Sequence, residues 1–397
     1  MNINRIAIWG STGSIGGQAL EIISQNPDKL KAVFLSCRNN LSKLIEQIEQ
    51  YSPKSVGVAS IEDADIIKNE FPELKVFIGE AGLEEAARKI DCDFMLNALV
   101  GISGLKPTMA AIRYAETCGH PYKIALANKE TLVTGGRLVM DAAKDAGVPI
   151  IPVDSEHSAI RQCIEGNNEK RIRRIIITAS GGPFLGLDYE ARTKVTLEDT
   201  LAHPNWNMGN KITVDSATMM NKGFEIIEAK WLFDLPIDRI EAMVHPGSIV
   251  HSLVEYEDGA MMAQLGVPSM KVPISYALSL PDRWPTDAGF VDLAKLGTLR
   301  FEEPTGETNR ALKLVHEALT QSETDGFDSG AIVINGANEV LVQLFLEKKI
   351  RFVDIMDTIE KVFTAHIPSK VLTFEDIFGL DKWSRERALA EIGTTRR

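Results

Sequence analysis

The chain has 397 residues, and at roughly 150 residues per domain this length predicts two or three domains. Hydrophobic residues make up 44% and charged residues 25% of the sequence, which excludes wholesale disorder and a collagen-like fold. The net charge of −12 argues against a long nucleic-acid interface. No run approaches the roughly 18 apolar residues of a membrane span, no secretory or transit segment is evident, and the four cysteines show no paired spacing. These features predict a cytoplasmic protein that binds neither nucleic acid nor a membrane.

Short apolar runs alternate with helical stretches through the first 155 residues. The first run, residues 5–9, ends at a glycine and is typical of a strand buried on both faces. Later runs repeat this pattern, with helical stretches such as 42–50 and 83–90 between them; the runs lie at residues 30–36, 55–59, 94–98, 123–127 and 149–153. The alternation predicts an α/β fold in which residues 1–152 form a doubly wound, Rossmann-like parallel sheet.

From about residue 156 the pattern becomes mixed, and we expect an α+β catalytic domain over residues 153–286. Residues 174–179 form another buried run, residues 218–233 have helical spacing, and residues 248–265 predict a hairpin around an Asp-Gly turn.

The rest of the chain lacks this mixture. Prolines lead into a polar stretch, residues 287–309, which we expect to be a linker. Residues 310–397 are rich in helix formers and contain no convincing strand, so they predict a C-terminal α-helical domain.

A glycine-rich turn follows the first strand and opens an apolar-periodic helix: Gly10-Ser11-Thr12-Gly13-Ser14-Ile15-Gly16-Gly17. Glycines let the backbone approach a pyrophosphate, whose charge then lies on free helix N–H groups. The spacing is G-x-x-G-x-x-G rather than the commoner G-x-G-x-x-G, and an ordinary tight loop is the alternative interpretation. The position between a buried strand and a helix favours a dinucleotide site.

The end of the second strand bears on the choice between NAD and NADP. An enzyme that uses NAD usually places Asp or Glu there to bind the ribose 2′-hydroxyl. This strand ends Ser36-Cys37-Arg38-Asn39-Asn40, with no acid and one guanidinium. An Arg can bind a 2′-phosphate through paired charge-assisted bonds, although a solvated surface Arg is the alternative. The missing acid favours NADP.

Two carboxylates, Asp154 and Glu156, follow the run that ends at residue 153. Ligands of open α/β sheets bind at the carboxyl ends of strands, and residues two apart in an extended chain point to the same side. The pair therefore suits Mg²⁺ or Mn²⁺. A helix cap with a dipole partner explains the same two acids equally well.

Residues 215–225 carry candidate phosphate and metal ligands. We expect Ser216 to cap the helix that follows and four polar side chains to share one helix face: Thr218, Asn221, Lys222 and Glu225. Ser, Asn and Lys at a helix N-terminus suit a phosphate, and Glu225 could complete a three-carboxylate metal site. The alternative is a polar stripe in which Lys222 and Glu225 form an ion pair.

Two loops offer further donors. The turn at residues 180–183 could present a hydroxyl and free amides to an anion. Residues 203–211 have the composition of a closing flap with Trp206 as an apolar cover, although the Trp could equally pack on the core. Covalent thiol catalysis is disfavoured because no cysteine follows a glycine-rich elbow or a basic partner.

Together these motifs resemble the 1-deoxy-D-xylulose 5-phosphate reductoisomerase family. The matching stretches occur in the family's order, at residues 10–16, 126–130, 153–157, 180–184, 203–206, 215–223 and 338–340. The resemblance implies an NADPH domain, a catalytic domain with a divalent cation (Mn, Mg or Co), a helical C-terminal domain and a homodimer. It also implies conversion of the phosphosugar 1-deoxy-D-xylulose 5-phosphate to 2-C-methyl-D-erythritol 4-phosphate for isoprenoid precursors, by a retroaldol–aldol rearrangement and hydride reduction.

The resemblance also implies roles for individual residues. The metal ligands would be Asp154, Glu156 and Glu225, which with Lys129 would form the catalytic group. The substrate would contact Lys129, Ser155, Glu156, Ser180, His203, Trp206, Ser216, Asn221, Lys222 and Glu225. NADPH would contact Thr12, Gly13, Ser14, Ile15, Cys37, Arg38, Asn39, Asn128, Glu130 and Gly209. The chain departs from the family where Cys37 replaces Gly and Asn207 replaces Ser.

Two other classes of protein compete with this interpretation. One is another NADP-dependent enzyme, such as a homoserine dehydrogenase-like protein or a semialdehyde dehydrogenase-like protein, which needs a nucleophilic Cys. The other is a sensor that binds NADP without catalysis and needs neither a metal nor a phosphosugar.

Overall fold

The computed structural model describes residues 3–118, 122–202, 205–206 and 208–395, and the chain folds into two compact units. The first unit consists of Met1–Thr131, Val139–Ser158 and Met270–Gly289. The second consists of Leu132–Leu138, Ala159–Ser269 and Phe290–Arg397. Each unit contains its own sheet and its own hydrophobic core.

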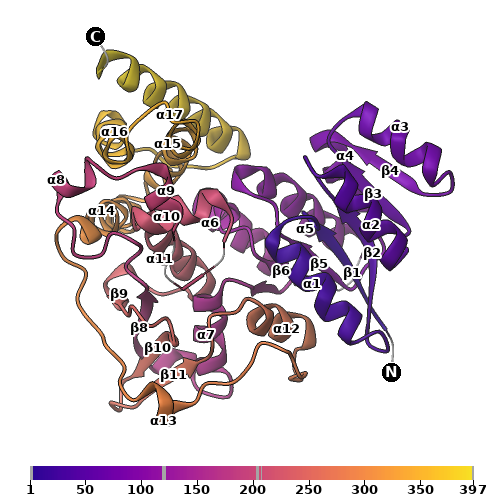
Figure 1. The fold of residues 1–397 in the computed structure, drawn as a ribbon, viewed down its shortest axis with the longest axis horizontal. Coiled ribbons are helices and arrows are strands. Elements are labelled where there is room, and N and C mark those ends of the chain that lie inside the picture. Colours follow the sequence, from indigo (N-terminus) through magenta and orange to yellow (C-terminus); the bar gives the residue numbers. More distant parts are fainter. Residues whose placement is uncertain (1–2, 119–121, 203–204, 207, 396–397) are drawn as a thin grey trace. The chain divides into compact units, whose positions relative to one another are not determined.

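The first unit is built on a seven-stranded parallel sheet with the order β4-β3-β2-β1-β5-β6-β7 (Figure 1). Its strands are β1 (Asn4–Trp9), β2 (Leu30–Ser36), β3 (Ser55–Val58), β4 (Lys75–Ile78), β5 (Phe94–Asn97), β6 (Lys123–Leu126) and β7 (Ile150–Pro152). The chain reverses its direction of travel across the sheet between β1 and β5, which is where such folds bind nucleotides. The predicted doubly wound sheet is confirmed.

The helices that lie wholly or partly in this unit are α1 (Ser14–Gln25), α2 (Leu41–Tyr51), α3 (Ile61–Glu70), α4 (Gly79–Lys89), η1 (Gly101–Gly104), α5 (Leu105–Cys118), α6 (Glu130–Asp145), α7 (Ser155–Ile164) and α12 (Lys271–Ser279). Most of them connect the strands and cover their apolar side chains. Helix α6 belongs to the second unit at Leu132–Leu138, and α7 belongs to it from Ala159 onward. Helix α12 comes from much later in the sequence, yet it packs on α1 and adds Ile274, Ala277 and Leu278 to this core. The fold of the first unit therefore depends on a distant segment.

The second unit contains a four-stranded sheet with the order β11-β10-β8-β9. Its strands are β8 (Ile172–Ala179), β9 (Ile240–Val244), β10 (Val250–Tyr256) and β11 (Met261–Leu265). Strands β10 and β11 pair antiparallel around Asp258-Gly259, so the predicted hairpin is confirmed. Strand β8 pairs antiparallel with β10 and parallel with β9, which makes the sheet mixed.

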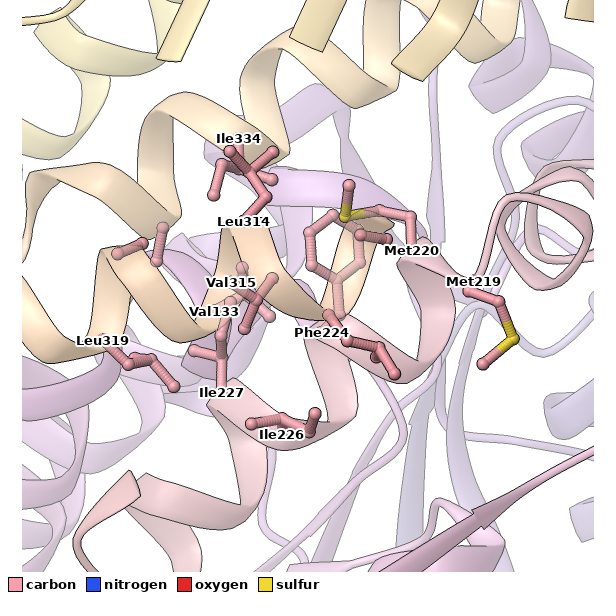
Figure 2. Packing of buried hydrophobic residues seen from close by; sticks show 14 of the residues in the cluster. Val133, Met219, Met220, Phe224, Ile226, Ile227, Leu314, Val315, Leu319 and Ile334 are labelled. Carbon is pink, nitrogen blue, oxygen red and sulfur yellow. The ribbon is translucent and has the colours of Figure 1, made fainter. Parts of the chain in front are cut away.

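Helices make up most of the second unit. They are η2 (Glu169–Arg171), α8 (Tyr189–Arg192), α9 (Leu197–Leu201), α10 (Asn210–Ala217), α11 (Met220–Phe233), η3 (Ile237–Arg239), α13 (Leu293–Leu296), η4 (Gly306–Asn309), α14 (Arg310–Asp325), α15 (Ser329–Leu346), α16 (Phe352–Ala365) and α17 (Phe374–Thr395). Helix α11 is buried along almost its whole length, and Figure 2 shows labelled members of the core that it shares with α14 and α15. The predicted C-terminal helical region is confirmed.

Helix α15 is long and apolar enough to cross a membrane by length and composition alone. However, 72% of this stretch is buried, and α15 packs against α14, α16 and α17. Its hydrophobicity is therefore that of a central core helix.

The division into domains at residues 152, 286 and 309 stays a prediction. The compact units place Met270–Gly289 with the sheet of the first unit, whereas the sequence pattern grouped it with the catalytic domain. The proposed linker, residues 287–309, contains the short helices α13 and η4 and an isolated bridge from Glu302 to Val244.

Candidate active site

The glycine-rich turn lies between β1 and α1 and is packed against backbone on its inner side. Gly10 has a φ of 89°, and a Cβ at this position would lie 2.6 Å from the carbonyl oxygen of Ala98. A Cβ on Gly16 would overlap the carbonyl oxygen of Gly10. Gly13 is exposed and caps α1, so the first N–H groups of the helix face outward. A pyrophosphate fits this arrangement because it needs close backbone approach and free amides.

Side chains from β2 and α2 hold this turn in place. The Gly10 N–H donates to Ser36 Oγ at 2.9 Å, and Gln47 Nε2 donates to the Ser11 carbonyl at 3.0 Å. Lys43 Nζ donates to the Thr12 carbonyl at 3.2 Å. The roles of Gln47 and Lys43 could not be predicted from the sequence, since nothing in the periodicity of a surface helix shows that it supports a loop 31 to 36 residues earlier.

The segment after β2 places Arg38 and Asn39 in exposed positions at the carboxyl end of the strand. Asn40 then caps α2 by accepting from the N–H of Lys43 at 3.1 Å. Cys37 is buried among the core side chains of the first unit, and burial raises the pKa of its thiol to about 11. Because its side chain points into the core, the change from the family's Gly leaves the outer surface of the segment open.

All three cysteines whose side chains are described are poor nucleophiles. Burial raises the pKa of Cys92 to about 12 and that of Cys163 to about 11, as it does for Cys37. Thiols with such values are protonated at neutral pH.

Asn128 and Glu130 lie after β6 and are both buried. The Asn128 amide donates to the carbonyls of Leu99 and Gly101 at 3.0 and 2.9 Å and to Glu130 Oε2 at 3.1 Å. Its oxygen accepts from the Thr131 N–H at 3.1 Å. These bonds join the loops after β5 and β6, so Asn128 has a structural role whether or not it contacts NADPH.

Lys129 and Asp154 form an ion pair at the carboxyl ends of β6 and β7. Lys129 Nζ lies 2.6 Å from Asp154 Oδ2, and the two side chains are only 8% and 14% exposed. Ser155 is the first residue of α7, and its hydroxyl donates to Glu156 in the same turn. The structure therefore brings together Lys129, Asp154, Ser155 and Glu156. It also places Glu156 in the first turn of α7, where its negative charge interacts favourably with the helix dipole.

In the second unit, the turn after β8 packs on the end of α10. Gly181 and Gly182 have φ values of 84° and 69°, and a Cβ on Gly182 would lie 2.7 Å from the Ser216 carbonyl oxygen. Ser180 Oγ accepts from the Gly182 N–H at 3.2 Å. Ser180 and Ser216, predicted from separate motifs, thus belong to contacting segments.

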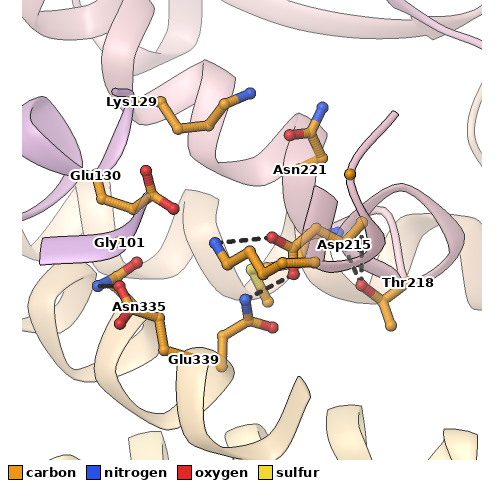
Figure 3. Close-up of polar contacts among 12 residues, drawn as sticks. Gly101, Lys129, Glu130, Asp215, Thr218, Asn221, Asn335 and Glu339 are labelled. Atoms are coloured by element: carbon orange, nitrogen blue, oxygen red, sulfur yellow. Dashed lines mark hydrogen bonds and ion pairs between the residues drawn. The ribbon is translucent and has the colours of Figure 1, made fainter. Parts of the chain in front are cut away.

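The predicted capping role of Ser216 is wrong. Ser216 lies inside α10. The helical conformation is interrupted after Ala217, and this break between the two helices ends where α11 begins at Met220. Met219 caps α11 with a φ of 66°, and Thr218 Oγ1 bridges the break by donating to the Asp215 carbonyl and accepting from the Met220 N–H (Figure 3). The helical periodicity of the sequence continues through this break. Methionine seldom adopts a left-handed conformation, so its presence in the sequence does not predict the end of a helix.

The polar face at the start of α11 is closely packed. Asn221 Nδ2 donates to Glu225 Oε1 at 2.5 Å, and Lys222 forms an ion pair with Glu225. Lys222 is 4% exposed and Glu225 is fully buried. The ion pair is the one that the polar-stripe alternative predicted. Its deep burial is unusual for a surface stripe, since charged groups are seldom buried without a specific arrangement.

The described part of the predicted flap packs on β10 and on the segment before it. The Trp206 ring lies 6.1 Å from that of His251, and Asn205 Nδ2 donates to the Pro246 carbonyl at 2.6 Å. Gly209 caps α10. His203 and Asn207 lie outside the described residues.

A doubly wound sheet with a glycine-rich turn at its switch point and no acid in residues 36–40 is typical of an NADP-dependent oxidoreductase. Three family models match the chain. The model for 1-deoxy-D-xylulose 5-phosphate reductoisomerase matches residues 6–136, and the model for its C-terminal domain matches residues 150–233. A second model for a C-terminal domain of the same enzyme matches residues 265–387. The chain belongs to the 1-deoxy-D-xylulose 5-phosphate reductoisomerase family.

Individual relatives agree over the full length. The curated enzyme of that name from Geobacter metallireducens is 46% identical over 393 residues, which cover 98% of this chain and 100% of the relative. The solved reductoisomerase from Zymomonas mobilis in complex with NADPH has a TM-score of 0.89 and 38% identity, covering 98% and 99% of the two chains. A solved reductoisomerase in complex with NADPH, fosmidomycin and magnesium has a TM-score of 0.91 and 35% identity, covering both chains fully.

Proposed function

We infer that this protein is an NADPH- and divalent-cation-dependent reductoisomerase that converts 1-deoxy-D-xylulose 5-phosphate to 2-C-methyl-D-erythritol 4-phosphate in the non-mevalonate route to isoprenoid precursors. The observation that carries this conclusion is the match over the entire chain to a relative solved with NADPH, fosmidomycin and magnesium. When bound, NADPH supplies the hydride for the reduction, and the cation polarises the substrate oxygens during the rearrangement of the carbon skeleton.

We propose that the glycine-rich turn and the segment after β2 hold NADPH. The inner side of the turn excludes a Cβ at Gly10 and Gly16, and its outer side presents the amides of α1. The exposed Arg38 and Asn39 offer donors for the 2′-phosphate. The remaining proposed contacts are Thr12, Gly13, Ser14, Ile15, Cys37, Asn128, Glu130 and Gly209; of these, Cys37 could contribute only backbone, because its side chain is buried.

We propose that Asp154, Glu156 and Glu225 hold the cation. Their carboxylate oxygens are the ligands that Mg²⁺ and Mn²⁺ prefer. Lys129, which pairs with Asp154, would orient or polarise the substrate oxygens near the metal, and the Ser155 hydroxyl donates to Glu156.

We propose that four residues of the second unit form a phosphate cradle: Ser180, Ser216, Asn221 and Lys222. A substrate dianion would compete with Glu225 for Asn221 and Lys222, whose donors now serve that carboxylate. His203 and Trp206 belong to the flap that we expect to exclude water over the bound substrate. The phosphate supplies binding energy that positions the reacting end.

We further propose a cytoplasmic homodimer that binds neither nucleic acid nor a membrane. Strand β11 lies at the edge of its sheet and exposes Met261 and Met262 by 48% and 46%. An edge strand with exposed apolar side chains favours pairing with another chain. A second copy of this chain would pair with the free N–H and C=O groups of the strand and cover its apolar side chains. Light scattering of the wild type and of Met262→Lys tests this; a monomeric wild type would refute the proposal.

The test of the main proposal is NADPH oxidation with 1-deoxy-D-xylulose 5-phosphate after chelation, with and without added Mn²⁺. We expect turnover that disappears with chelator and returns with metal. Turnover indifferent to metal would refute the carboxylate site and keep the reductase. A folded preparation that binds NADPH but does not turn over would favour the sensor.

A further inference from the structure

The carboxylate of Asp215 in α10 is bound from two elements. Lys211 Nζ, one turn earlier in the same helix, lies 2.9 Å from Oδ2. Asn338 Nδ2, from α15 and 123 residues later, donates to Oδ1 at 2.8 Å. Asp215 is 2% exposed and Asn338 is fully buried. Figure 3 labels Asp215 and marks two interactions of its carboxylate with dashed lines. The C-terminal helices therefore reach directly into the segment that precedes the proposed phosphate cradle.

The position of Asp215 affects the positions of three residues of that cradle, namely Ser216, Asn221 and Lys222. Its neighbour is Ser216, and its carbonyl accepts from Thr218 Oγ1 at 3.1 Å across the break between α10 and α11. Met219 adopts a left-handed conformation in this break, which persists only where the surroundings impose it. Asn221 and Lys222 follow within the next turn. A shift of Asp215 would consequently move all of these groups.

We propose that Asn338 is a positioning residue for the substrate phosphate, acting through Asp215 on Ser216, Asn221 and Lys222. The inference rests on the phosphate cradle proposed above. An amide suits this position because it donates to Asp215 without adding charge beside the Lys211 pair. A leucine would leave one buried oxygen of Asp215 without this donor, and an aspartate would set two carboxylates against each other.

The same helix provides a matched control. Asn335 lies one turn earlier in α15 and is also fully buried, but its Nδ2 donates at 3.1 Å to Glu339 of its own helix. Replacing Asn335 by leucine removes a buried amide from α15 while leaving Asp215 and its partners in place. Effects shared by the two positions report on helix stability, and effects confined to Asn338 report on the cradle.

The experiment measures inorganic phosphate binding by calorimetry, without NADPH or metal, and steady-state kinetics in full-length Asn338→Leu and Asn335→Leu. For Asn338→Leu we expect the phosphate Kd and the substrate KM to rise on the order of tenfold or more, with a much smaller change in kcat and an unchanged NADPH Kd. For Asn335→Leu we expect a lower melting temperature and an unchanged phosphate Kd. Equal phosphate affinities in the two variants would overturn the proposal.

A charge exchange covers the case in which Asn338→Leu fails to fold. Asn338→Asp alone should weaken phosphate binding, and adding Asp215→Asn should restore much of it, because one amide again faces one carboxylate; no recovery would overturn the proposal. Lys222→Met tests the cradle separately. If Lys222→Met weakens phosphate binding and the Asn338 variants do not, only the positioning role fails; if Lys222→Met has no effect, the cradle fails and this inference with it.

Discussion

Substituting Gly16 by alanine tests whether the nucleotide turn is packed as described. A Cβ at this position would overlap the Gly10 carbonyl oxygen and lie 2.5 Å from Ser11 Cα and 2.8 Å from the Ser11 carbonyl carbon. Carbon atoms that are not bonded prefer about 3.5–4.0 Å, so the turn or the helix must move by about 1 Å. All three neighbours are backbone atoms, which no rotamer change can relieve. We expect a destabilisation at the upper end of what overpacking causes, about 3 kcal/mol. It is offset by about 1 kcal/mol because alanine has a higher helix propensity than glycine.

The net expectation is a loss of about 2 kcal/mol in the free energy of unfolding and a weaker cofactor site. If the shift removes two hydrogen bonds to the pyrophosphate, at about 1.5 kcal/mol each, the NADPH Kd rises roughly 100-fold. Gly17→Ala is the matched control, because its Cβ would meet only the flexible end of Lys43 at 3.7 Å. Urea unfolding measures the free energy of unfolding of both variants, and NADPH titration measures their Kd for the cofactor. A Gly16→Ala protein as stable as Gly17→Ala, with wild-type NADPH affinity, would refute this account of the turn.

Three further predictions concern the cofactor, the metal and pH. Arg38→Ala should raise the KM for NADPH far more than that for NADH, since only NADPH carries the 2′-phosphate; equal effects in parallel kinetics would remove Arg38 from that role. Glu225→Gln should lower metal-dependent turnover on the order of 100-fold while NADPH affinity in a binding titration stays the same, and unchanged turnover would exclude Glu225 from the metal site. Burial lowers the pKa of His366 below its ordinary 6.5, so the unfolded chain takes up a proton before the folded one and stability falls as the pH drops below 6.5. Unfolding midpoints of His366→Gln should depend less on pH in that range; an unaltered slope would contradict the prediction.

The sequence predicted the central strands of the first unit well because they are buried on both faces and read as continuous apolar runs. It missed β4, since Phe77 alone of its four residues is buried, and β9, whose three central residues are only half-buried. Short, partly exposed strands lack the run of apolar residues that marks a central one.

The candidate residues were found where chemistry and local pattern coincide, as in Asp154 and Glu156 after a strand. The break at Met219 and the long-range bond between Asn338 and Asp215 were not, because a left-handed methionine and a contact over 123 residues leave no periodic trace. Burial of Cys37 likewise became evident only from the packing of the first unit.

The interleaved course of the chain affects how the protein is made. The first unit needs α12 to complete the core around Ile274 and Leu278, and that helix belongs to Met270–Gly289. A ribosome therefore synthesises much of the second unit before the first can close its core, although domains commonly fold in order as they emerge. The nascent sheet must wait with one apolar surface uncovered for more than a hundred residues of synthesis, from Ser158 to Met270. Rapid translation or chaperone binding over that interval would protect the chain from aggregation.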